Sequence, residues 1–275
     1  MAIFERIVIA SNRAGENPGL ERAAQQFHAL QGPGNIRTVH VAGAHSGRET
    51  LDSVLTAASS HGADLLIAGG RSHVFASRAA MLSPCSVLMV PDGSAVQMNR
   101  ILVPVDFSHH SQHALRTGAG LAAQSGGEAL CLFIESEDAP WHLQPDVHAE
   151  HAHKLASLQE FAHGTVGSRP SLRCIAEPVE HSSAILKRVR AFSLPHAIEG
   201  ADVAATIVHV AEREESGLIV IGTRGRSRSA AVLLGSVTEK VIQFAHCPVL
   251  AVRIHGANLG LLDVLLGHAK APAVA

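Results

Sequence analysis

Apolar runs and amphipathic stretches alternate along the second half of the chain. The run RILVPVD (100–106) is apolar between its ends, which is typical of a strand buried on both faces. The stretch SQHALRTGAGLAA (111–123) follows, with apolar residues at helical spacing. The run EALCLFIE (128–135) predicts the next strand, and residues 148–162 predict the next helix.

The same alternation continues toward the C-terminus. We expect strands at 172–176, 217–222 and 248–252, and helices at 182–192, 201–214 and 236–245. Parallel strands must be joined by crossover connections, which are usually helices. The pattern therefore predicts an α/β fold with a doubly wound parallel sheet.

Three segments of the first half resemble three segments of the second half, in the same order. RIVIASN (6–12) resembles RILVPVD (100–106), ADLLIAGGRS (63–72) resembles SGLIVIGTRG (216–225), and CSVLMVP (85–91) resembles CPVLAVR (247–253). A duplicated domain explains this shared order.

The boundary between the two copies is expected near the turn that contains Gly93. We therefore predict tandem domains at 1–93 and 97–255. The second domain is longer than a minimal unit, which indicates an insertion around 140–198. An apolar tail at 256–275 follows, and it is expected to form a helix over a sheet edge or a partner's surface, or a frayed end.

A glycine pattern follows the predicted strand at 217–222. Gly222 ends that strand, and ligands bind at the carboxyl ends of strands in open parallel sheets. Glycine there lets backbone N–H groups approach an anion without an intervening Cβ. Gly235 and Ser236 open the next predicted helix, whose N-terminus favours a phosphate, and the serine hydroxyl can cap the helix or donate to an oxygen.

Nine residues separate Gly225 from Gly235, which allows the loop to fold back so that both glycine sites face one ligand. Arg224, Arg226 and Arg228 lie in this loop, where at least one can screen phosphate charge. A G-x-x-G pair alone favours a plain glycine-rich turn with solvated arginines. The P-loop pattern G-x-x-x-x-G-K-[ST] and the G-x-G-x-x-G dinucleotide fingerprint are both missing from the sequence.

The full pattern resembles the nucleotide-binding universal stress proteins. Their motif is G-2x-G-9x-G-[S/T], and the glycines from Gly222 to Ser236 match it, together with the first strand ending Pro104-Val105-Asp106 and the closing CPVLAV. The resemblance covers residues 98–254 without a gap. Tandem domains are common in that family, so it extends over nearly the whole chain and implies two Rossmann-like domains.

The resemblance implies a site for ATP, or for ADP or AMP, with Mg²⁺ arriving with the nucleotide. Its adenine and ribose part rests on the resemblance alone and comprises Pro104, Val105, Asp106 and the backbone of Ile134. Its phosphate part comprises Gly222, Arg224, Gly225, Gly235, Ser236, Val237 and Thr238.

The first half carries a damaged copy of this pattern. Asn12 stands at the position of the first-strand aspartate, and Ser72 replaces Gly225. Gly69 and Cys85 are 16 positions apart, whereas the corresponding Gly222 and Cys247 are 25 positions apart. Nine residues are therefore missing from the first half, and the Gly-Ser pair is among them. We predict that the first domain does not bind ATP in the family's manner and instead packs on the second domain or presents a surface to a partner.

Composition excludes several classes of function. The net charge is −2 and aromatic residues make up 3% of the chain, which argues against nucleic-acid and membrane binding. The four cysteines are scattered along the sequence, which indicates reduced thiols rather than a disulfide framework. No apolar stretch reaches the 18 residues that a membrane-spanning helix needs. We expect a cytoplasmic protein that forms a homodimer, or an internal pseudo-dimer in which the last strands of the two halves pair, and that acts on an unspecified protein partner.

Histidines offer two further candidate sites. His148, His151 and His153, near His142 and Asp146, form a possible metal cluster, but a polar helix surface is favoured. His109, His110 and His113 follow the first strand, where a solvated first helical turn is favoured over a nucleotide contact. Cys247 is expected to be a small buried residue rather than a nucleophile.

Three functions remain open from the sequence. The first is a regulatory nucleotide-binding protein with at most slow ATP hydrolysis. The second is an adenylating or ATP-hydrolysing enzyme of the same superfamily, although the chain lacks the S-G-G-x-D-S and H-I-G-H motifs. The third is an interaction module without nucleotide.

Overall fold

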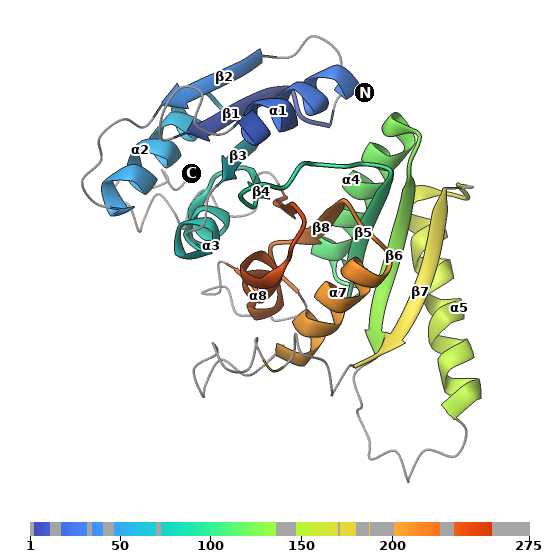
Figure 1. Ribbon diagram of the computed structural model, residues 1–275. Coiled ribbons are helices and arrows are strands. Elements are labelled where there is room, and N and C mark those ends of the chain that lie inside the picture. The colour runs from blue at the N-terminus through green and yellow to red at the C-terminus, as the bar shows by residue number, and fades with distance from the viewer. Residues whose placement is uncertain are drawn as a thin grey trace, which may run out of the picture.

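The computed structural model describes residues 3–11, 18–31, 35–40, 47–69, 73–135, 147–169, 171–179, 187, 201–225 and 234–254 (Figure 1). Among these residues, the strands are β1 (Arg6–Ser11), β2 (Asn35–His40), β3 (Leu65–Gly69), β4 (Ser86–Val90), β5 (Arg100–Val105), β6 (Glu128–Glu135), β7 (Leu172–Pro178), β8 (Leu218–Gly222) and β9 (Val249–Val252). The helices are α1 (Pro18–Gln31), α2 (Gly47–Ser60), α3 (His73–Leu82), α4 (His109–Ser125), α5 (Val147–Val166), α7 (Ala201–Arg213) and α8 (Ser236–Phe244).

These strands form one sheet in the order β2-β1-β3-β4-β9-β8-β5-β6-β7. All neighbours are parallel except β4 and β9, which pair antiparallel with Leu88 opposite Leu250. We call β1–β4 with α1–α3 the N-terminal half, and β5–β9 with α4, α5, α7 and α8 the C-terminal half. The predicted α/β fold is confirmed, and the last strands of the two halves, β4 and β9, pair within one chain.

Helices cover both faces of the sheet. Along β8, Leu218 and Val220 pack into the core shared with α1, α4 and α5, whereas Ile219 and Ile221 pack into the core shared with α2, α3, α7 and α8. All four side chains are at most 6% exposed. Figure 1 shows α4 and α7 on opposite sides of β5 and β6. The uninterrupted apolar runs of the sequence are therefore strands buried on both faces.

The predicted elements of the C-terminal half match the structure closely. The helix expected at 111–123 is α4, which begins at His109 because the Ser108 side chain accepts a hydrogen bond from the Ser111 amide and caps it. Of the segment 140–198, α5 and β7 are regular elements, and β7 pairs with β6 along its length. Apart from Lys187, the predicted helix at 182–192 lies outside the described residues, as does the tail.

The strand order determines where a ligand can bind. From β5 the chain continues to β6 on one side, whereas β8 lies on the other side of β5. The strand order of the C-terminal half therefore reverses between β5 and β8. In open α/β sheets, this point leaves a crevice at the carboxyl ends of the two strands.

Candidate functional site

Asp106 and Gly225 lie side by side at the carboxyl ends of β5 and β8. A Cβ built on Gly225 would be only 2.8 Å from Oδ2 of Asp106. Any larger residue at this position would displace the carboxylate, so glycine permits the approach. The structure thus brings together two predicted site residues from segments far apart in the sequence.

Gly235 lies against the same turn. Its amide donates a hydrogen bond to the Thr223 carbonyl at 2.8 Å, and a Cβ on Gly235 would be 3.6 Å from that oxygen and 3.7 Å from the Gly225 nitrogen. After the loop, the chain therefore returns to the turn at Thr223 and Gly225 that follows β8, as the glycine spacing predicts. Both glycine sites meet at the N-terminus of α8.

The first turn of α8 presents backbone donors at this point. Gly235 is the N-cap, with extended φ and ψ of −71° and 145° and no side-chain cap. The first helical hydrogen bond runs from Glu239 to Gly235, so the amides of Ser236, Val237 and Thr238 precede it and have no acceptor inside the helix. The exposed Ser236 does not cap the helix, contrary to one of the two roles expected for it.

The side chain of Thr238 holds α8 to β8. Its hydroxyl donates to the Gly222 carbonyl at 2.8 Å, and the residue is 3% exposed. This bond engages the hydroxyl, so only the backbone of Thr238 remains for a phosphate. The structure therefore assigns its side chain a positioning role.

Gly222 serves close packing between β8 and α4. A Cβ on Gly222 would lie 3.0 Å from the backbone carbon and oxygen of His110 and 3.1 Å from its Cβ. The missing side chain therefore faces α4. Gly222 admits the first turn of that helix to the end of the strand, which is a different role from the predicted contact with phosphates.

Asp106 is oriented by a compact turn. Its Oδ1 accepts the Ser108 amide at 3.1 Å, and its own amide donates to the Ser111 hydroxyl at 3.3 Å. Phe107 adopts a left-handed φ of 62°, which is strained for a non-glycine residue. Ring contacts to Phe133 and Phe161, with centroids 4.8 and 5.2 Å away, hold Phe107 in this conformation.

His110 lies against Gly222 at the site, although the sequence favours a solvated helical turn there. Its Nδ1 is buried and has no hydrogen-bond partner among the described residues. Burial lowers the pKa of His110, and the positive charge of Arg224 lowers it further, against a smaller opposing effect of Asp106. The prediction of a solvated turn is therefore wrong for His110, whereas His109 is exposed. The sequence holds one signal for this contact, because Gly222 has no side chain and so leaves room for His110 at the end of β8.

Arg253 is a second residue that sequence reasoning missed. It follows β9 and is 7% exposed. Its Nη2 donates to the carbonyls of Ala80 and Met81 at 3.2 and 2.7 Å, at the end of α3, and its amide donates to the Ser86 hydroxyl. Burial lowers the pKa of Arg253, with a contribution from Arg224. Arg253 is therefore close enough to Arg224 to be affected by its charge, and it also bonds to α3 of the N-terminal half.

The residues predicted for the adenine side lie on two faces of the sheet. Val105 packs into the core with α4, whereas Ile134 packs into the core with α7 and α8. Side chains alternate along a strand, so Pro104 faces the same side as Ile134. Pro104 and Val105 therefore do not line one surface together, although both strands end at the same edge.

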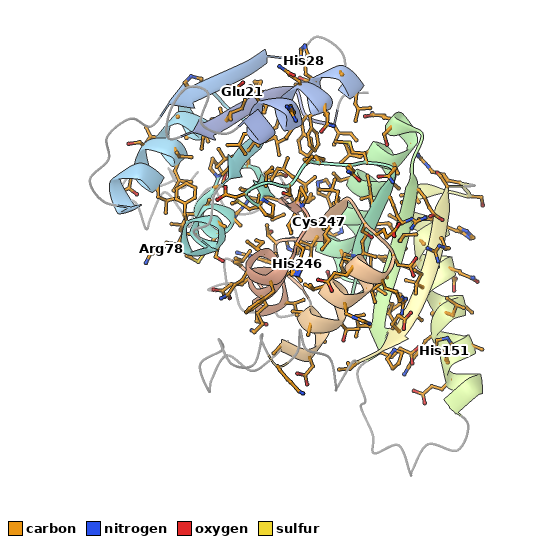
Figure 2. All side chains as sticks on the ribbon, in the orientation of Figure 1. Glu21, His28, Arg78, His151, His246 and Cys247 are labelled. Carbon is orange, nitrogen blue, oxygen red and sulfur yellow. The ribbon has the colours of Figure 1, made fainter. Side chains whose placement is uncertain are left out.

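The histidine cluster forms a polar helix surface in its described part. His151, which Figure 2 labels on α5, has its Nδ1 2.7 Å from Oε1 of Glu135. Lys154 pairs with Glu135 and Glu150. No group of three His, Cys, Asp or Glu residues fit to hold a metal occurs among the described residues. The side chain of His148, together with His142 and Asp146, lies outside them.

Two further observations concern the other candidates. Burial raises the pKa of Cys247 to about 11, so its thiol stays protonated at neutral pH, as befits a small buried residue. Within the described part of the chain, every helix is too short or too polar to cross a membrane.

The N-terminal half has a shorter connection at the corresponding place. Three residues (70–72) join β3 to α3, whereas thirteen (223–235) join β8 to α8. Asn12, Arg71 and Ser72 lie outside the described residues. The connection is thus ten residues shorter, one more than the nine-residue deletion inferred from the sequence.

Comparison with known proteins identifies the family. The profile of the universal stress protein family matches residues 98–253, which are 156 of the 275 residues. Two universal stress proteins of Methanocaldococcus jannaschii are similar to this chain. One is 53% identical over 47 residues, 17% of this chain and 28% of that protein. The other is 25% identical over 172 residues, 58% of this chain and 97% of that protein.

A solved structure shows the same fold over most of the chain. The crystal structure of a universal stress protein from Archaeoglobus fulgidus aligns with a TM-score of 0.57 and 14% identity. The alignment covers 92% of this chain and 97% of that one. At this identity the likeness concerns the fold, and the family profile carries the assignment. Since that profile spans more than half of the sequence, the chain belongs to the universal stress protein family.

Proposed function

We propose that this chain binds an adenine nucleotide and acts as a regulatory protein with at most slow ATP hydrolysis. One observation carries the proposal. Asp106 after β5, the turn at Gly225 after β8 and the N-cap Gly235 of α8 meet within a few ångströms, at the point where the strand order reverses. Ligands of open α/β sheets bind at such points.

The phosphates would lie at the N-terminus of α8. The amides of Ser236, Val237 and Thr238 supply donors there, and the helix dipole favours negative charge. Arg224 is half-buried beside this turn and adds positive charge. Gly225 and Gly235 keep side chains out of the space between these donors and Asp106.

The nucleoside would extend toward β5 and β6. The Asp106 carboxylate is an acceptor for ribose hydroxyls, and the turn at Ser108 orients it. Pro104 and the backbone of Ile134, at the same edge of the sheet, would border the adenine. The strand ending Pro104-Val105-Asp106, which matches the family's pattern, supports this placement of the nucleoside.

Mg²⁺ would arrive with the nucleotide. This ion keeps several waters and binds through substrate phosphates with one or two carboxylates. Asp106 faces the ribose in this proposal, and the described residues hold no cluster that would bind a metal alone. The residues present therefore fit a phosphate-borne ion, whose chemistry would be to neutralise phosphate charge.

The N-terminal half would not bind a nucleotide in the same way. The three-residue connection between β3 and α3 leaves no room for a second glycine pair before the helix. We propose that this half, predicted as domain 1–93, packs on the domain at 97–255 through the β4–β9 pair. That internal contact would take the place of a dimer contact between two chains.

The test is whether the purified protein carries and binds adenine nucleotide. We expect mass spectrometry to detect ATP, ADP or AMP released on heat denaturation, and calorimetry to detect binding of added ATP. If both are negative, the proposal is wrong and an interaction module without nucleotide is favoured. Rapid hydrolysis, or transfer of AMP to an acceptor, would instead favour the enzyme.

A further inference from the structure

Two of the four cysteines are neighbours on adjacent strands. Cys131 of β6 and Cys174 of β7 are register partners in a parallel pair. Adjacent strands lie about 4.8 Å apart, so the two Cα atoms fall inside the range of about 4.4–6.8 Å that disulfides span. Their wide separation in the sequence conceals this proximity.

The two side chains also share one face of the sheet. Cys131 is part of the core beneath α4 and α5, and Cys174 packs at the border of the same core. Cys131 is 0% exposed, whereas Cys174 is half-buried. Because β7 ends the strand order of the described sheet, Cys174 lies on an edge strand. A small reagent therefore reaches Cys174 first.

The electrostatics distinguish this pair from the other thiols. A hydrogen bond from the Cys131 thiol lowers the pKa of Cys174, and the same contact, together with burial, raises the pKa of Cys131. Burial raises the pKa of Cys85 and of Cys247 to about 11. Only the thiolate is nucleophilic, so the lowered pKa and the partial exposure of Cys174 together favour it as the attacking thiol.

We propose that Cys131 and Cys174 form a redox-modification site at which a hydroperoxide oxidises the two thiols to an intrachain disulfide. Cys174 is the attacking thiol and Cys131 the resolving thiol. The site is separate from the nucleotide proposal, because neither cysteine belongs to the phosphate-binding turn.

The reaction balances in two steps. The Cys174 thiolate attacks one oxygen of hydrogen peroxide, the O–O bond breaks, and Cys174 becomes a sulfenic acid while hydroxide leaves and takes a proton to form water. The Cys131 sulfur then attacks the Cys174 sulfur as its own proton is transferred to the sulfenic hydroxyl. The S–S bond forms, the S–O bond breaks, and the thiol proton leaves with the hydroxyl as a second water. Two thiols and one peroxide thus give one disulfide and two waters.

The bond would join the edge strand β7 covalently to β6. It would close a loop that contains α5, which restricts the unfolded chain and stabilises the folded one. The oxidised protein should therefore melt at a higher temperature than the reduced protein. A cross-strand bond of this kind is also readily reversed by a dithiol reductant.

The test treats the reduced full chain with one equivalent of hydrogen peroxide and maps peptides without reduction. We expect a single cross-linked peptide pair joining Cys131 to Cys174, with Cys85 and Cys247 still alkylated by iodoacetamide after denaturation. Dithiothreitol should release the pair. Four free thiols after treatment, or a disulfide with other partners, would overturn the proposal without any variant being needed.

Variants separate the two roles. Cys131→Ser should leave a sulfenic acid on Cys174 that dimedone traps, whereas Cys174→Ser should abolish both the disulfide and the trapping. Cys85→Ser and Cys247→Ser are the matched controls and should form the disulfide like the wild type. Dimedone labelling at Cys131 in the Cys174→Ser variant would show that the attacking thiol was assigned wrongly.

Discussion

His110 links the site to pH at the scale of a single residue. Arg224, His109, Asp106 and Arg253 are the charged and titratable groups that act on it, and the burial of His110 with the charge of Arg224 lowers its pKa. The imidazole is therefore neutral near pH 7. Phosphates bound beside Arg224 would favour the imidazolium, so binding would take up a proton and tighten as the pH falls.

We accordingly predict proton uptake when ATP binds near pH 7. Calorimetry in two buffers with different ionisation enthalpies measures the number of protons. His110→Gln should reduce the uptake to what the phosphates themselves contribute, and should change the affinity only a few-fold at high pH. Equal uptake by both proteins would show that His110 does not sense the bound anion.

At the scale of elements, Gly118 sets how closely α4 packs on the sheet. A Cβ on Gly118 would be 2.5 Å from Cγ2 of Val103, a fully buried and conformationally stiff side chain. Gly118→Ala should therefore lower the free energy of unfolding by ~1–3 kcal/mol, although alanine favours helices. Urea denaturation measures this change.

Gly164 of α5 provides the matched control. It is exposed, and a Cβ there would meet no atom of the described residues within 4 Å. Gly164→Ala should raise the free energy of unfolding by ~0.5–1 kcal/mol through helix propensity alone. If both substitutions changed the stability in the same direction, the tight packing of α4 against β5 would not be a determinant of stability.

Elements were predicted better than contacts between them, for a physical reason. The run at β5 and the amphipathic pattern of α4 are local, so hydrophobic periodicity reveals them. The meeting of Gly225 and Gly235 was also expected, because their spacing encodes a loop that folds back. The pairing of Cys131 with Cys174 depends on strand register across an intervening helix, which no local pattern encodes.

At the scale of the whole molecule, Arg253 joins the two halves. It donates to the carbonyls of Ala80 and Met81 at the C-terminal end of α3, where a positive charge is also favoured by the helix dipole. Removing it leaves the buried Ala80 carbonyl and the partly buried Met81 carbonyl without this donor, which costs about 1–3 kcal/mol. Arg253→Ala should therefore speed amide hydrogen exchange in α3 and β4 but not in β6 and β7.

The exposed Arg169 is a suitable control, because its Nε donates to the Val166 carbonyl at the end of α5. Arg169→Ala should change the stability by less than about 1 kcal/mol, since water replaces the lost donor. Uniformly faster exchange over the whole chain in Arg253→Ala would show that the residue supports general stability rather than the junction.

The central claim is one nucleotide site at the switch point of the C-terminal half. A crystal structure with ATP and Mg²⁺ tests it most directly, with Gly235→Val as the matched variant. Among the described residues, no atom lies nearer than 3.6 Å to a Cβ at Gly235, so the fold should persist. We predict phosphates at the amides of Ser236, Val237 and Thr238, the ribose at Asp106, and no nucleotide bound to Gly235→Val. Phosphates between β3 and α3 instead would contradict the account.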